Sequence, residues 1–136
     1  MDDPLPKYPG YSLRRAASAT GAELSGRLAD LGLRQVDASV LLLIGANPKV
    51  TASALGRQLD IQRANMVPLL KRLEDNGLLD RIPIDGKSQG LQLTAAGEAA
   101  LARAQSVIAR FEKELLEKIP PAHRDHLLPA LEALWR

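Results

Sequence analysis

The hydrophobic positions between Gln35 and Gly77 follow a helical period in three successive blocks. Apolar residues recur every three or four positions at 35–46, 51–59 and 62–76, which is the spacing of helices with one buried face. The inward positions are Val36, Val40, Leu43 and Ile44 in the first block, Leu55 and Leu59 in the second, and Met66, Leu69, Leu70 and Leu73 in the third. Asn47-Pro48 ends the first helix, Thr51 is suited to cap the second, and Gly77 is suited to end the third.

Strand-like runs follow the third helix. Residues 78–84 and 90–93 are rich in Leu and Ile, and Asp85-Gly86 between them is a typical turn pair,. Val50 is expected to form a short strand before the second helix. The order helix, turn, helix, hairpin predicts a winged helix-turn-helix, in a mainly α protein with a small β-hairpin wing (α+β).

Helical patterns also flank this central region. One runs from Ser12 to Leu31 and is closed by Gly32; a second covers 95–118; a third covers 122–135 and should be kinked or split at Pro129,. Residues 1–10 hold three prolines and a glycine and predict an extended arm. We therefore divide the chain into an arm (1–11), a helical dimerisation region (12–34 and 95–136) and a DNA-reading region (35–94).

The pattern in the long helix favours self-association. Its apolar residues alternate at steps of three and four over two heptads: Leu101, Ala104, Ile108, Phe111 and Leu115,. The alternative is packing inside one chain. Dimerisation is preferred because a long helix outside a compact winged core has little else to cover its stripe. The expected interface is formed by Leu13, Leu24, Ile108, Phe111, Leu115, Leu127 and Leu131.

Composition narrows the classes of function. The chain has 136 residues, of which 46% are hydrophobic, so one small core is expected,. It contains no cysteine, which excludes disulfides, thiolate catalysis and cysteine-ligated zinc within it,. The N-terminus has no apolar run of the kind found in a signal peptide, and Ala38–Ala46 is too short to cross a membrane. We expect a cytoplasmic protein without cofactor or membrane partner.

The charge is small but unevenly placed. The net charge is +2, and between Lys49 and Thr94 seven basic residues face five acidic ones, so the whole excess lies in the DNA-reading region. Aromatic residues are only 3% of the chain, which argues against stacking on single strands,. A double-stranded DNA partner fits better.

The region from Gln35 to Gly97 resembles the MarR family of bacterial transcription regulators. The resemblance rests on QVDASVLLLIGANPKVTASALGRQLDI, on LLKRLEDNGLLDR, on the wing with Asp85, Lys87 and Ser88, and on LQLTAAGEAAL. It implies a homodimer on a pseudo-palindromic operator, usually a repressor, and commonly one released by a small phenolic or carboxylate effector.

DNA contacts can then be assigned to this chain's residues. Gln62, Arg63 and Asn65 at the start of the third helix are expected to meet bases, since Gln and Asn suit adenine and Arg suits guanine. Thr51, Ser53 and Arg57 are expected at phosphates, and Lys71 and Arg72 either bind the backbone or lie on the surface. Lys87 and Ser88 form the wing contact, although an ordinary charged hairpin turn is the alternative.

Three positions depart from the family pattern. The usual wing Asp-x-Arg reads Asp85-Gly86-Lys87, and lysine lacks the planar fork of arginine. Pro68 stands where many relatives have a polar or basic residue, and it removes one helical N–H. The stretch VPLLKRLE is similar to the hydroperoxide-sensing branch, but that branch needs a cysteine near the N-terminus. Peroxide sensing therefore does not carry over.

Other classes of function remain as alternatives. His123 and His126 could hold a metal on the last helix, but no third ligand is evident and we expect no metal site. No catalytic motif is found, so we expect no enzyme. A winged helix used only for protein contacts is the remaining possibility.

For an effector pocket the candidates are Tyr8, Tyr11, Arg14 and Arg15, with plain packing as the alternative.

Overall fold

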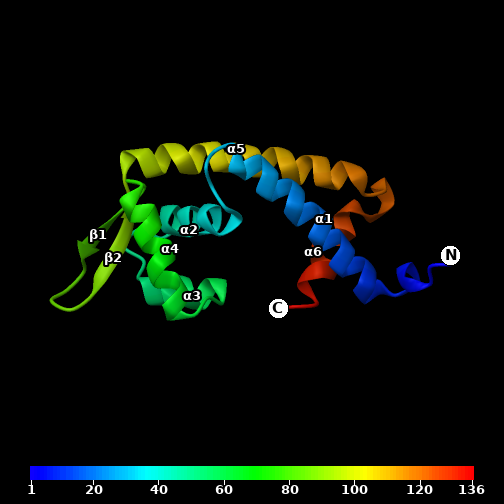
Figure 1. The fold of residues 1–136 in the computed structure, drawn as a ribbon, viewed down its shortest axis with the longest axis horizontal. Coiled ribbons are helices and arrows are strands. Elements are labelled where there is room, and N and C mark those ends of the chain that lie inside the picture. Colours follow the sequence, from blue (N-terminus) through cyan, green and yellow to red (C-terminus); the bar gives the residue numbers. More distant parts are fainter. The chain divides into compact units, whose positions relative to one another are not determined.

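The computed structural model describes residues 1–136, and its regular elements are helices apart from one short hairpin (Figure 1). The order is η1 (Leu5–Lys7), α1 (Pro9–Ala29), α2 (Gln35–Ala46), α3 (Ala52–Leu59), α4 (Arg63–Asp75), β1 (Leu79–Pro83), β2 (Gln89–Leu93), α5 (Ala95–Lys118), η2 (Pro121–His123) and α6 (Arg124–Glu132). Two compact units can be separated, one of residues 25–105 and one of residues 1–24 with 106–136.

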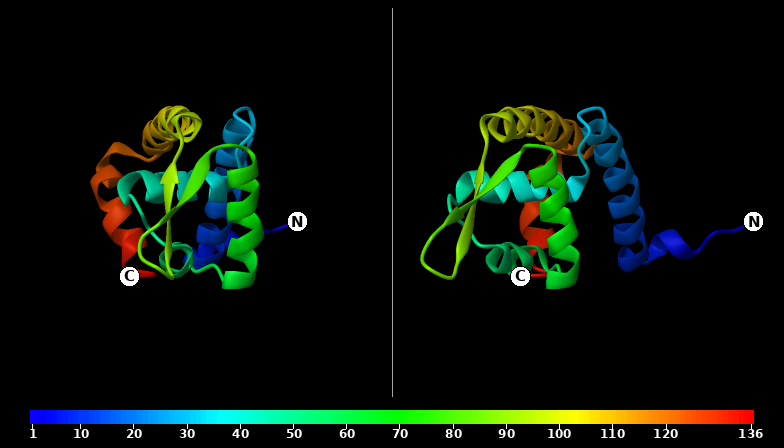
Figure 2. Two further views of the ribbon diagram at one scale, coloured as in Figure 1. Left: turned by 90° about the vertical axis from the view of Figure 1, so that its left-hand side faces the viewer. Right: turned by 60° about the vertical axis from the view of Figure 1, so that its left-hand side comes forward.

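The first unit has the predicted winged helix-turn-helix. Its core joins Val40 and Ile44 of α2, Leu55 of α3, the inner face of α4, and Leu79 and Leu91 of the hairpin. Strands β1 and β2 pair antiparallel with Leu79 opposite Leu93, and Val50 forms an isolated bridge to Leu91. The hairpin continues beyond the helices, so that its turn projects from the unit (Figures 1 and 2).

Two glycines end helices in the same way. Gly32 and Gly77 adopt φ of 72° and 75°. After each, the next residue donates its N–H to a carbonyl five positions back, Leu33 to Leu28 and Leu78 to Leu73. This is a Schellman motif, which needs a left-handed residue and therefore favours glycine. The predicted ends of both helices are confirmed to within a few residues.

Gly97 packs the start of α5 against the chain before β1. A Cβ at this position would overlap the carbonyl oxygen of Leu78. We expect Gly97→Ala to lower the free energy of unfolding by about 1–3 kcal/mol, because backbone must move to make room. Gly26→Ala is the control, since nothing lies within 4 Å of its added Cβ inside α1, and it should stabilise. Urea unfolding measures both, and equal stabilities would contradict this account.

The second unit contains both ends of the chain. Lys118 pairs with Glu23 at 3.3 Å. The guanidinium of Arg124 donates to the carbonyl oxygens of Ile119 (2.9 Å) and Glu117 (3.1 Å), so it satisfies the end of α5,.

The prediction of an extended arm is wrong. The first ten residues are not all extended, because η1 covers Leu5–Lys7 and α1 begins at Pro9, where the fixed φ of proline favours a first helical residue,. The last helix agrees with its predicted range to within a few residues, since it begins at Arg124 after η2 and ends at Glu132. It is not split at Pro129, where a proline removes only one N–H from a short helix.

The predicted interface residues divide by exposure. Leu101, Ala104 and Phe111 are buried in the single chain. For these three positions of the apolar stripe on α5, the alternative of packing inside one chain holds, and Phe111 is not free to form an interface. Leu24, Ile108, Leu115 and Leu127 are half-buried, and Leu13 and Leu131 are exposed. The exposed large apolar residues also include Leu116, Leu128, Leu134 and Trp135.

Candidate nucleic-acid interface

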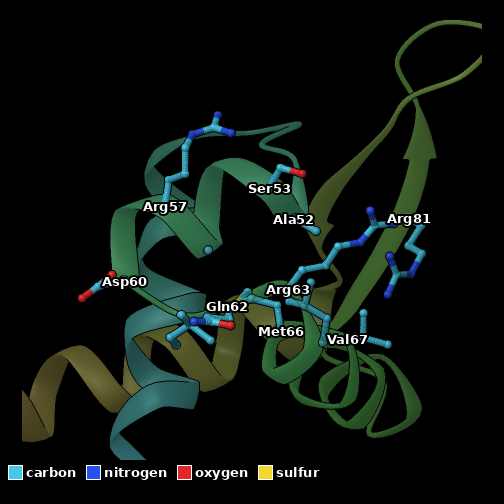
Figure 3. Close-up of a pocket in the computed structure, with 12 residues that line it drawn as sticks. Ala52, Ser53, Arg57, Asp60, Gln62, Arg63, Met66, Val67 and Arg81 are labelled. Carbon is cyan, nitrogen blue, oxygen red and sulfur yellow. The ribbon is translucent and has the colours of Figure 1, made fainter.

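Helix α3 presents short polar side chains at its start. The hydroxyl of Thr51 accepts the N–H of Ala54 at 3.2 Å, so the predicted N-cap is confirmed,. Ser53 and Arg57 are exposed and follow on this helix (Figure 3). The hydroxyl of Ser53 and the guanidinium of Arg57 have the chemistry of phosphate contacts.

The turn between α3 and α4 is tight. Ile61 donates its N–H to the carbonyl of Gly56 at 2.9 Å, and a Cβ at Gly56 would come within 2.9 Å of the Ile61 carbonyl oxygen. The chain changes direction at Asp60, which has a φ of 53°. Aspartate tolerates this left-handed conformation better than most residues. The turn holds α3 and α4 in contact, as a reading helix requires.

Helix α4 separates a buried face from an exposed one. Met66, Leu69, Leu70 and Leu73 are at most 8% exposed. Gln62 is the N-cap, and Gln62, Arg63 and Asn65 are exposed at the helix start. Val67, one turn after Arg63, is 56% exposed. Three hydrogen-bonding side chains beside an apolar one can read base edges and a thymine methyl group.

Arg81 lies at the junction of helix and hairpin, and we did not predict it as a site residue. Its Nε pairs with Glu74 of α4 at 3.2 Å. Together with Arg63 it lines a hollow of about 560 Å³ between α3, α4 and β1, and Figure 3 shows both side chains at this hollow. A second hollow of about 650 Å³ continues from Arg63 and Arg81 to Lys87 of the wing. The two arginines thus connect the reading helix to the wing.

The wing turn is built by Asp85. Its Oδ1 accepts the N–H groups of Lys87 (2.9 Å) and Ser88 (2.8 Å). These N–H groups hold the pKa of the Asp85 carboxyl below its ordinary value,. The stabilisation is complete above the ordinary pKa and is lost as pH falls through the lowered one. At neutral pH the ionised carboxylate therefore fixes the turn that displays Lys87.

Two predicted backbone contacts are engaged within the chain. Lys71 pairs with Asp75 at 3.0 Å, and both side chains are largely exposed. Arg72 forms two hydrogen bonds, of 3.0 and 2.6 Å, to the buried carboxylate of Asp37 on α2. The suggestion that Arg72 binds DNA or is merely surface is therefore wrong. Its partner lies 35 positions away, and no local pattern shows such a pair.

The remaining candidates do not gather into a site. His123 and His126 are exposed, and no group of three or more His, Asp or Glu side chains is placed to hold a metal ion. Arg15 donates to the hydroxyl of Tyr11 at 3.3 Å, with its guanidinium 6.0 Å from that ring. Tyr8 and Arg14 are exposed. No helix has both the length and the apolar character needed to span a membrane.

A helix-turn-helix followed by a wing, with exposed polar side chains at the start of its second helix, defines the winged helix-turn-helix class. Residues 31–88 match the model of the MarR family. The chain belongs to this family of transcriptional regulators.

Several known proteins are similar along nearly the whole chain. The transcriptional repressor CouR, bound to a 23-mer DNA duplex, is 37% identical with a TM-score of 0.89, over 97% of this chain and 95% of that one. CouR bound to p-coumaroyl-CoA is 35% identical with a TM-score of 0.88, over 100% and 97%. The HTH-type transcriptional repressor Rv2887 of Mycobacterium tuberculosis is 28% identical over 127 residues, which is 92% of this chain and 91% of that protein. A structure of Rv2887 with salicylic acid has a TM-score of 0.73, with 28% identity over 98% and 97% of the two chains.

Proposed function

We propose that this chain is a homodimeric transcriptional repressor that binds a pseudo-palindromic DNA operator and leaves it when a small ligand binds. The observation that carries the proposal is the exposed face of α4 beside Arg81 and the wing, in a chain similar to a repressor bound to a DNA duplex. Two reading helices about 34 Å apart would enter successive major grooves on one side of the duplex. We propose the cytoplasm as its place of action, and no catalytic activity.

The contacts divide into two kinds. Gln62, Arg63 and Asn65 are proposed to read bases. The backbone contacts are proposed for Thr51, Ser53 and Arg57 of the α3 region, Lys71 of α4, Arg81 of β1, and Lys87 and Ser88 of the wing. Arg81 is included because its side chain lines both hollows while its Nε is held by Glu74.

The proposal is tested on duplexes that tile the DNA flanking the protein's own gene. Fluorescence anisotropy should find one fragment bound about 10³-fold or more tightly than a scrambled duplex of equal length, as is usual for specific DNA-binding proteins. Footprinting should show two protected half-sites. Equal affinity for every fragment would refute sequence-specific binding and would favour a protein-contact module.

The effector is proposed to be an aromatic carboxylate or its coenzyme A thioester. The ligands named for the relatives, salicylic acid for Rv2887 and p-coumaroyl-CoA for CouR, share a phenol ring that carries an acyl carbon, directly in salicylic acid and through a two-carbon link in the p-coumaroyl group. Titration of the protein–operator complex with salicylate, p-coumarate and p-coumaroyl-CoA should release DNA with at least one of them. Benzyl alcohol is the control, because it has the ring without the carboxyl carbon.

Release is expected to be reversible and independent of peroxide. The chain has no cysteine to oxidise, so the sulfenic acid that thiol-based sensors form is not available. We expect operator affinity to be unchanged after treatment with an organic hydroperoxide, measured by gel shift. Loss of binding that a thiol reductant restores would contradict this expectation.

A further inference from the structure

Asp37 is a charged side chain with no exposed surface. It is the third residue of α2, and its Oδ2 accepts the N–H of Arg34 at 2.8 Å, which caps the start of that helix. The same Oδ2 accepts Nη1 of Arg72 at 3.0 Å, and Oδ1 accepts Nη2 at 2.6 Å. One buried carboxylate thus joins the start of α2 to the last part of the reading helix.

A contribution to folding stability alone does not explain the Asp37–Arg72 pair. Burying the Asp37 carboxylate is costly, the Arg72 side chain stays 32% exposed, and apolar side chains of similar volume often stabilise a core as well or better. A bidentate arginine–carboxylate pair supplies direction instead, because two parallel hydrogen bonds fix the plane of the guanidinium. The geometry therefore points to a role in orientation.

Apart from the Glu74–Arg81 pair near its C-terminal end, the contacts that hold α4 in the core are apolar and less directional. The buried side chains of α4 are Met66 and the leucines at 69, 70 and 73, and dispersion contacts of this kind have little directional preference. Near the helix surface, about 6 Å from the axis, a rotation of about 20° moves a side chain by about 2 Å. That displacement would break a base-edge hydrogen bond.

Arg72 is well placed to prevent this rotation. It lies two helical turns after Asn65, so the two residues share a face of α4,. The core covers the neighbouring face, and Arg63 points into the hollow beside Arg81 (Figure 3). Fixing Arg72 on Asp37 therefore fixes the angle at which Asn65 and Arg63 are presented.

We propose that the Asp37–Arg72 pair is a positioning clamp that sets the rotation of the reading helix and thereby the discrimination between DNA sequences. The inference rests on the proposed function, because it presumes that α4 reads DNA. Neither residue touches a base. Their effect passes through the angle of α4, so losing the clamp lowers operator preference while general attraction to duplex DNA remains.

The test is a double variant, Asp37→Asn with Arg72→Met. Asparagine retains an oxygen acceptor for the N–H of Arg34, and methionine replaces the apolar stem of the arginine, so no buried charge is left unpaired. Glu114→Gln with Arg110→Met is the matched control, since it also removes one carboxylate and one guanidinium, here a solvent-accessible pair on α5 outside the proposed DNA contacts. Melting temperature, operator affinity and scrambled-duplex affinity are measured for each protein at one salt concentration.

We expect the double variant to bind the scrambled duplex as the Arg110–Glu114 control does, and to lose operator preference by about tenfold or more, the size of one base contact. The control should keep the wild-type ratio of the two affinities. A folded double variant with the wild-type ratio would overturn the clamp. If the double variant does not fold, Arg72→Lys keeps the charge without the fork, and it should also lose preference; a wild-type ratio in that variant would overturn the clamp equally.

Hydrogen exchange of the DNA-free protein separates the clamp from the proposed function. Breaking the pair should speed amide exchange in α4, with the core amides of α2 remaining protected. Unchanged exchange in α4 would overturn the clamp even if DNA binding changed. A wild-type protein that binds operator and scrambled duplexes alike would instead refute the proposed function, while the exchange result would still decide whether the pair holds the helix.

Discussion

Replacing both Ile108 and Leu115 with glutamate is expected to convert the dimer into a monomer and to remove operator binding. Both residues lie on α5 and stay half-buried within a single chain, so part of their apolar surface is still uncovered. Two carboxylates at these positions would be buried without partners if the interface formed, which costs several kcal/mol. Since a second half-site typically contributes about 10²- to 10⁴-fold in affinity, operator binding should fall by that factor.

Sedimentation and anisotropy on the operator measure the two effects. The control is Ala102→Glu with Ala109→Glu, which adds the same two charges to exposed positions of α5. This control should remain a dimer and bind the operator. Circular dichroism must show that the test variant is folded. A wild-type monomer at micromolar concentration, or a test variant that remains a dimer, would contradict the interface proposed here.

Local sequence signals were enough to predict the elements of the DNA-reading region. The predicted bounds of α2 are those observed, as are those of α5 directly after this region, because each begins beside a clear break in the pattern and shows helical spacing. Thr51 and Gly77 mark helix ends by mechanisms that involve only neighbouring residues,. Both ends of the chain were less predictable, since short turns and prolines there compete with weak helical patterns.

Contacts between distant residues were not predictable. Nothing in the sequence around Asp37 distinguishes a buried carboxylate from an ordinary polar residue on a helix. Its pairing with Arg72 depends on how α2 and α4 pack, and the same holds for Glu74 and Arg81 across the end of α4 and β1. Periodicity identifies the buried face of a helix, but it does not identify which charge on another element meets it.

The apolar stripe of α5 shows the same limit of prediction from sequence. Its heptad spacing correctly marked positions that avoid water, but spacing does not say whether the cover comes from the same chain or from another. Leu101 and Ala104 are buried in one chain, and Leu101 lies against Gly45 of α2. Ile108 and Leu115 are half-buried in one chain, and they are where we expect a partner chain to pack.

Replacing Arg63 or Lys87 with alanine is expected to weaken DNA binding in two different ways. Arg63 lies in the first turn of α4, on the exposed side, and its guanidinium can bind a guanine with two hydrogen bonds,. Arg63→Ala should cost about 1–3 kcal/mol on the operator and should flatten preference at one base position in each half-site.

Lys87 lies at the turn that Asp85 fixes, and it is a single flexible charge on an exposed wing. It can attract phosphates without reading sequence. Lys87→Ala should weaken binding to all duplexes alike. It should also reduce the slope of log affinity against log salt concentration by about one per subunit. Neither side chain belongs to the core, so melting temperature and dimerisation should be unchanged in both variants.

The decisive measurement is the affinity for operator and scrambled duplexes over a series of salt concentrations. Arg103→Ala is the control, because it removes one exposed charge from α5, away from the reading helix and wing in sequence and outside the residues that line their hollows. Its operator preference and salt dependence should match the wild type. An unchanged preference in Arg63→Ala would mean that α4 does not dock by its first turn. An unchanged salt dependence in Lys87→Ala would mean that the wing does not reach the DNA backbone.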